Sequence, residues 1–200
     1  MLADEYERQR LVDRCYASEV FKDRDDHDPS TAVLPEKKAV RDFYHLCRQT
    51  TQGVLVIGEE SYRLLGYEWP NQGSESGRRA DMVALNSAGG LVVFEAKLEN
   101  RYSPFAGVLE GLDYLACLTC AANFAKVESG FLRWNAKAGN PSPTIFTDVV
   151  PRIDALHEVI VLGSPEYYGR FDRSGRGNGW KEFVLAPAPA KNMQIGRAHV

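Results

Sequence analysis

The sequence has no apolar run long enough to cross a bilayer and no internal repeat, so we expect no membrane partner. It also carries little excess charge, with a formal net charge of −3. The molecule as a whole is therefore not a nonspecific binder of polyanions. Any affinity for nucleic acid has to come from local arginines and from a metal at an acidic patch.

Cysteine and histidine are scarce, with four residues of each. Cys15 and Cys47 are isolated, and Cys117 and Cys120 fall within one predicted helix, so neither a disulfide framework nor paired zinc-ligand spacing is indicated. The histidines are scattered and form no Ser/His/Asp or Cys/His constellation. Acidic residues crowd the first positions, which does not favour a signal peptide. We expect a cytoplasmic protein.

Length and composition predict one globular domain, because 200 residues with 44% hydrophobic content can bury a substantial core. Residues 1–31 are expected to form a charged helix and linker, and residues 32–193 the domain. Residues 195–200 match the peptide that the start of a common sequencing adapter would encode. We therefore expect 194–200 to be an artefact and the natural domain to be cut short at this end.

Two apolar segments in the middle of the chain flank a glycine-containing turn. Residues 81–85 and 91–97 are rich in aliphatic side chains, and the sequence NSAGG at 86–90 favours a tight turn. The pattern predicts an antiparallel hairpin. Its second strand is apolar on both faces over its first half and so is expected at the centre of a sheet. The apolar run at 157–163 predicts a further core strand.

The register of this hairpin decides where its charged residues lie. If Leu85 pairs with Leu91, Asp81 falls directly opposite Glu95, with their Cβ atoms about 5 Å apart. A shift of one residue would place Asp81 opposite Ala96 instead.

Lys97 follows Glu95 by two positions and therefore shares its face of the strand. Carboxylates left unpaired at a buried strand are costly, so a positive charge has to compensate them. Mg²⁺ prefers hard oxygen ligands such as one or two carboxylates. The pattern predicts a divalent metal at Asp81 and Glu95, either Mg²⁺ or Mn²⁺.

Asp81, thirteen further residues, and then Glu95-Ala96-Lys97 resembles the catalytic signature of the PD-(D/E)XK nuclease superfamily, with Ala80 where the name-giving proline would stand. The resemblance implies an α/β (α+β mixed sheet) class and a restriction-endonuclease-like αβββαβ core, with helices flanking a central mixed sheet. It also implies that Asp81, Glu95 and the backbone carbonyl of Ala96 bind Mg²⁺, while Lys97 orients and activates the attacking water.

The function implied by this resemblance is metal-dependent, endonuclease-type hydrolysis of DNA phosphodiester bonds, with Asp81, Glu95 and Lys97 as catalytic residues. The alternative is a catalytically inactive nuclease-like domain that binds nucleic acid or a partner protein. A homodimer or a partner subunit is compatible with either function.

A helix is predicted directly after the motif, beginning at Ser103-Pro104. Gly107 and Gly111 lie four residues apart in it, which indicates close approach to a neighbouring backbone. Glu110 and Asp113 are expected on a solvated side of this helix, although family members often carry a functional polar residue here.

The family usually opens with a helix that contributes an acidic residue, and residues 35–48 have a helical apolar stripe. Glu36, Glu59 and Glu60 are the candidates for that acid, and the sequence does not choose among them. Each can equally be an ordinary surface carboxylate.

Four arginines are candidates for contact with nucleic acid. Arg78 and Arg79 precede the first strand of the hairpin, and their guanidinium groups match phosphate oxygens, although they could equally pair with acidic residues. Arg173 and Arg176 lie among aromatic residues and glycines at 167–180, where bases could stack. A solvent loop without a ligand explains that segment equally well.

Overall fold

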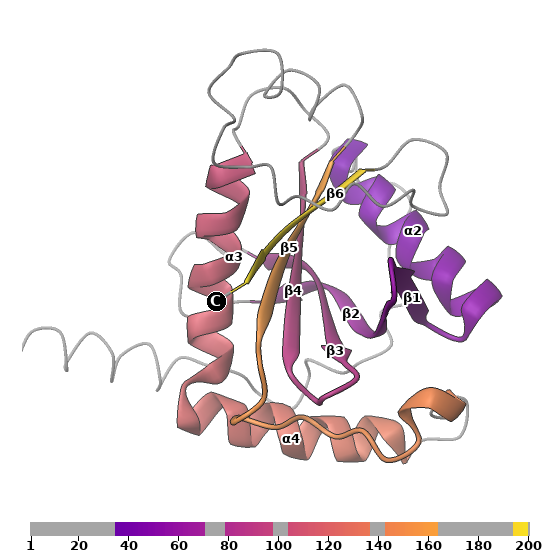
Figure 1. The fold of residues 1–200 in the computed structure, drawn as a ribbon, viewed down its shortest axis with the longest axis vertical. Coiled ribbons are helices and arrows are strands. Elements are labelled where there is room, and N and C mark those ends of the chain that lie inside the picture. Colours follow the sequence, from indigo (N-terminus) through magenta and orange to yellow (C-terminus); the bar gives the residue numbers. More distant parts are fainter. Residues whose placement is uncertain (1–34, 71–78, 98–103, 137–142, 164–193, 200) are drawn as a thin grey trace, which may run out of the picture.

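The computed structural model describes residues 35–70, 79–97, 104–136, 143–163 and 194–199. Within these ranges a mixed sheet of six strands is flanked by helices on both faces (Figure 1). This confirms the expected mixed α/β class. None of the helices in the described ranges combines the length and apolar character that a bilayer-spanning segment needs.

The elements follow one another as α2 (Pro35–Thr51), β1 (Val54–Ile57), β2 (Glu60–Pro70), β3 (Arg79–Asn86), β4 (Leu91–Lys97), α3 (Pro104–Thr119), α4 (Ala121–Asn135), the 3₁₀ helix η2 (Thr144–Phe146), β5 (Glu158–Gly163) and β6 (Gln194–His199). Neighbouring strands in the sheet follow chain order. All pairs are antiparallel except β4 and β5, which are parallel. Parallel neighbours require a long crossover connection, and here α3 and α4 belong to it.

Four strands separate α2 from α3, whereas the αβββαβ core implied by the resemblance has three. The difference arises because a turn at Gly58, with φ +62°, folds β1 back onto β2 as a hairpin. Residues 54–70 therefore contribute two strands to the sheet.

The predicted hairpin of β3 and β4 is confirmed, including its register. Leu85 pairs with Leu91 and Met82 pairs with Phe94. Every residue of β4 is buried, as expected for a central strand. The predicted strand at 157–163 is confirmed as β5.

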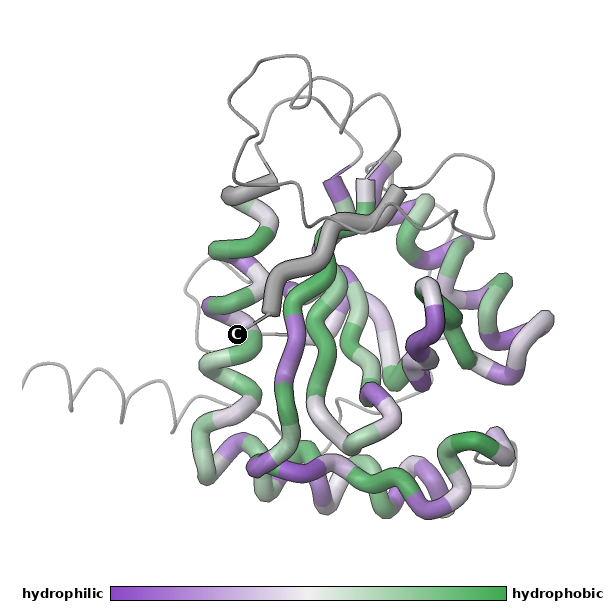
Figure 2. The backbone as a smooth tube through the Cα atoms, viewed as in Figure 1, coloured by the Kyte–Doolittle hydropathy of each residue, from purple (hydrophilic) through white to green (hydrophobic). Residues whose placement is uncertain are grey.

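Side chains alternate between the two faces of the sheet and build two hydrophobic cores. One face packs against α3 and α4, and its members from β3 and β4 are Ala80, Val83, Leu85, Leu91 and Val93. The other face packs against α2, and its members from the same strands are Met82, Ala84, Val92, Phe94 and Ala96. Figure 2 shows the apolar residues concentrated in these central strands.

The turn between β3 and β4 packs closely against the segment that leads into β5. The Asn86 side chain accepts hydrogen bonds from the Gly90 amide at 2.8 Å and the Ala88 amide at 3.1 Å, and it donates one to the Leu156 carbonyl at 2.9 Å. Gly89 has φ +87°, and a Cβ added at Gly90 would overlap the Leu156 carbonyl. Glycine is therefore required at both positions.

Two helices occupy the region after β4, and the second was not predicted. α3 ends at Thr119, and Cys120 adopts an extended conformation before α4 begins at Ala121. Cys117 and Cys120 thus flank a break and do not lie within one helix. α4 buries an apolar stripe against the end of the sheet near the β3–β4 turn (Figure 1), namely Phe124, Val127, Phe131 and Trp134.

Buried Arg63 ties β2 to α4. Its guanidinium lies 5.0 Å from the ring centroid of Trp134 and 5.3 Å from that of Phe131, and it donates a 2.7 Å hydrogen bond to Asn135 Oδ1. Burial, with a smaller effect of the Arg48 charge, lowers the pKa of Arg63 to about 10. The side chain remains cationic at neutral pH and stacks on the aromatic rings.

The last strand, β6, lies antiparallel to β5 and pairs Leu162 with Ile195. The prediction that 194–200 derive from an adapter concerns the origin of these residues, which their placement in the sheet does not test. Residues 1–31, expected to form a charged helix and linker, lie outside the described ranges.

Candidate active site

Asp81, Glu95 and Lys97 lie on two adjacent strands at the end of the sheet opposite to the β3–β4 turn. The register that pairs Met82 with Phe94 places Asp81 opposite Glu95 when it is continued by one residue. Glu95 and Lys97 share the face that α3 covers. Glu95 is 3% exposed and Lys97 is 8% exposed, so these charges are largely removed from water.

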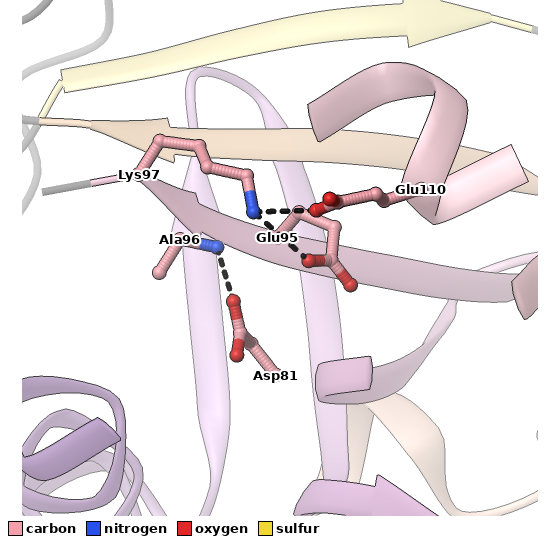
Figure 3. Close-up of polar contacts among 5 residues, drawn as sticks. All are labelled: Asp81, Glu95, Ala96, Lys97 and Glu110. Atoms are coloured by element: carbon pink, nitrogen blue, oxygen red, sulfur yellow. Dashed lines mark hydrogen bonds and ion pairs between the residues drawn. The ribbon is translucent and has the colours of Figure 1, made fainter. Parts of the chain in front are cut away.

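The Lys97 ammonium is held between two carboxylates (Figure 3). Its Nζ donates a 2.7 Å hydrogen bond to Glu110 Oε2 on α3 and lies 3.6 Å from Glu95 Oε2. Glu110 therefore contacts the site although its side chain is 38% exposed, whereas Asp113 is exposed as expected.

Gly107 allows α3 to approach this lysine. A Cβ at this position would lie 3.3 Å from Lys97 Cε and 3.2 Å from a Val161 methyl group. A Cβ at Gly111 would overlap a methyl group of Val159. The expected close approach is confirmed, but the neighbours are side chains of β4 and β5 and not the backbone.

The Asp81 carboxylate is oriented by the backbone of the adjacent strand. Its Oδ2 accepts a 2.7 Å hydrogen bond from the Ala96 amide, and Figure 3 shows it turned toward Ala96 and not toward Lys97. This contact uses the N–H of Ala96. A role for the Ala96 carbonyl as a metal ligand stays a prediction.

The pKa values of both carboxylates are raised when Lys97 is the only cation beside them. Burial is the largest cause that raises the pKa of Asp81, to about 6, with the charges of Glu36 and Glu110 adding to it and the Ala96 hydrogen bond and Lys97 opposing it. Burial is also the largest cause that raises the pKa of Glu95, and the charge of Asp81 is the second. The negative charge of one carboxylate makes ionisation of the other less favourable.

Burial lowers the pKa of Lys97, but the hydrogen bond to Glu110 and the charges of Glu95, Glu110 and Asp81 outweigh this effect. The pKa of Lys97 therefore rises above its ordinary value. Lys97 is an ammonium donor at neutral pH, and it is suited to orient a water or a phosphate oxygen and not to accept a proton.

A divalent cation fits the carboxylate pair. Glu95 Oε1 is buried and has no hydrogen-bond partner among the described residues. An unsatisfied buried carboxylate oxygen is costly, and coordination would satisfy it. The described residues contain no group of three or more His, Cys, Asp or Glu side chains arranged for a metal. Mg²⁺ needs only one or two carboxylates when waters and substrate oxygens complete its shell.

Of the three candidates for an additional acid, Glu36 is the one that lies close to the site. Its charge contributes to the raised pKa of Asp81, so Glu36 lies within electrostatic range of that carboxylate. Glu59 lies in the exposed turn between β1 and β2, and Glu60 accepts a 2.8 Å hydrogen bond from the Tyr62 hydroxyl.

Arg79 is exposed and pairs with a carboxylate that sequence reasoning missed. Its Nη1 lies 3.3 Å from Glu68 Oε2, and Lys37 Nζ lies 3.8 Å from Glu68 Oε1. Glu68 has φ +46°, an uncommon value for a residue with a side chain. A positive φ cannot be read from the sequence, so nothing marked this position.

The other arginine candidates, Arg78, Arg173 and Arg176, lie outside the described ranges. Their contact with nucleic acid stays a prediction.

Comparisons with protein-family models, with curated proteins and with solved structures found no match for this chain.

Proposed function

We propose that this protein hydrolyses DNA phosphodiester bonds with Mg²⁺ held by Asp81 and Glu95, as in restriction-endonuclease-like nucleases with an αβββαβ core. The observation that carries the proposal is Glu95 Oε1, a buried oxygen without a hydrogen-bond partner among the described residues, beside a second carboxylate and an ammonium group. Mn²⁺ is the expected substitute for Mg²⁺ because it accepts the same oxygen ligands.

Each residue has a role that follows from its contacts. The Ala96 amide fixes the Asp81 carboxylate in one orientation, and burial restricts Glu95. When bound, Mg²⁺ would lower the pKa of a water and stabilise charge on the phosphate. The Ala96 carbonyl is a candidate third protein ligand.

Lys97 acts as an oriented hydrogen-bond donor. An ammonium has three N–H groups, and the contact with Glu110 occupies one of them while Glu95 attracts another. A remaining N–H can point to the attacking water or to a non-bridging phosphate oxygen. A fixed positive charge at that place stabilises the charge that develops on the phosphate.

The test is nicking of supercoiled plasmid DNA with and without Mg²⁺ by the parent, Asp81→Ala and Lys97→Ala. We expect nicking by the parent that EDTA abolishes, and little nicking by either variant. Asp113→Ala and Lys38→Ala are the matched controls, because both charged side chains are exposed. Melting curves of all variants establish that they are folded.

Nicking by folded Asp81→Ala at the parental rate would refute the proposal. A parent that binds DNA without cutting it in Mg²⁺ or Mn²⁺ would favour the alternative, an inactive nuclease-like domain that binds nucleic acid. Calorimetric uptake of Mn²⁺ by the parent but not by Glu95→Gln would support the metal site without relying on activity.

A further inference from the structure

Two exposed cations from different elements converge on one carboxylate. Lys37 on α2 and Arg79 at the start of β3 both contact Glu68 on β2, at 3.8 Å and 3.3 Å. The side chains of Lys37 and Arg79 are 49% and 41% exposed, whereas that of Glu68 is 13% exposed. The carboxylate is thus shielded, and the cations face solvent.

This cluster borders the carboxylate pair of the candidate active site. Arg79 precedes Asp81 by two residues and so projects from the same face of β3. Glu68 falls opposite Asp81, between the pairs Tyr67 with Met82 and Trp69 with Ala80. Lys37 directly follows Glu36, whose charge reaches Asp81.

The cluster carries a net positive charge because two cations share one anion. Lys37 and Arg79 are partly exposed, so water weakens their pairs with Glu68, and a phosphate can replace Glu68 as the partner of both cations. Arg79 contacts Glu68 through one terminal nitrogen, Nη1. A guanidinium has further N–H groups in the same plane that match phosphate oxygens.

We propose that Lys37 and Arg79 form a phosphate clamp. When DNA binds, both cations leave Glu68 and contact a backbone phosphate next to the phosphodiester bond that lies at Asp81. The location of that bond rests on the proposed function. The binding of the phosphate does not, because it needs neither metal nor cleavage. Glu68 acts as the acceptor that holds both cations in the free protein.

The test measures binding of a fluorescent duplex oligonucleotide by anisotropy in EDTA, where no cleavage can occur. We expect Lys37→Ala and Arg79→Ala each to weaken binding several-fold and to reduce the slope of log affinity against log salt by about 1. Glu68→Gln removes a competing negative charge and is expected to raise the affinity.

Lys38→Ala is the matched control, because Lys38 is an exposed lysine at the adjacent position of α2. Losses by Lys37→Ala and Arg79→Ala no larger than that of Lys38→Ala would overturn the clamp, as would a parent without measurable affinity or a lower affinity in Glu68→Gln. Binding that depends on Lys37 and Arg79 in a protein that never nicks plasmid would leave the clamp standing and refute only the hydrolytic function.

Discussion

The 2.7 Å hydrogen bond from Lys97 Nζ to Glu110 Oε2 joins the last residue of β4 to the second turn of α3. It fixes a flexible lysine side chain at the point where two carboxylates face each other. The crossover helix therefore contributes directly to the candidate active site, in addition to covering the sheet.

We expect Glu110→Ala to lower the rate of DNA hydrolysis by roughly 10- to 100-fold, because a misplaced ammonium group no longer meets the reacting phosphate. Glu110→Gln should retain most of the rate, since its amide oxygen still accepts the Lys97 hydrogen bond. The stability change should be below about 1 kcal/mol, because the Glu110 side chain is 38% exposed. Rates equal to that of Asp113→Ala in plasmid nicking would contradict this role.

The stability of the metal-free protein should fall as pH rises through about 6. The pKa of Asp81 lies at about 6, above its ordinary value of 3.8, so its contribution to stability is present below the ordinary value and is lost above about 6. The loss should be roughly 1–3 kcal/mol. Melting temperatures in EDTA between about pH 4 and 8 should decline more steeply for the parent than for Asp81→Asn, and parallel profiles would exclude this shift.

Cys47 should react with alkylating agents only when the protein unfolds. Its side chain is buried on α2, and burial raises the pKa of its thiol to about 11, so little thiolate exists at neutral pH. Cys117 and Cys120 are partly exposed and should react in the folded protein. Pulse alkylation followed by peptide mass spectrometry measures each site, and rapid labelling of Cys47 without denaturant would show that α2 is not packed as described.

Gly111→Ala should lower the free energy of unfolding by roughly 1–3 kcal/mol, because the added methyl group overlaps Val159. Gly107→Ala should be less destabilising. Its Cβ would meet neighbours at 3.2 to 3.3 Å without overlap, and alanine gains up to about 1 kcal/mol in helix propensity. Chemical denaturation of both variants gives the difference. Equal stability of the two would mean that α3 can shift along β5.

The core of the site could be predicted from the sequence because it depends on local order. A short turn between two apolar segments fixes the register, and the register fixes the positions of Asp81 and Glu95. The contribution of Glu110 could not be derived in this way, because it depends on how α3 is rotated against the sheet. Two closely spaced glycines on α3 set that rotation by admitting the side chains of β5.

Other features were missed for different reasons. α4 had a readable signal, since Phe124, Val127 and Phe131 recur at helical spacing. Its separation from α3 depends on one extended residue, Cys120, which no composition rule marks. Glu68 was missed because its importance arises from a contact between α2, β2 and β3.

The tight fit of Gly89 and Gly90 against the segment before β5 has a consequence for sequence change. Hairpin tips commonly accept insertions, but a longer tip here would collide with the main chain at Val150 and Leu156. Insertions between the two acidic positions are therefore disfavoured. The packing of the turn thus keeps the number of residues between Asp81 and Glu95 constant, although the turn lies at the other end of the hairpin.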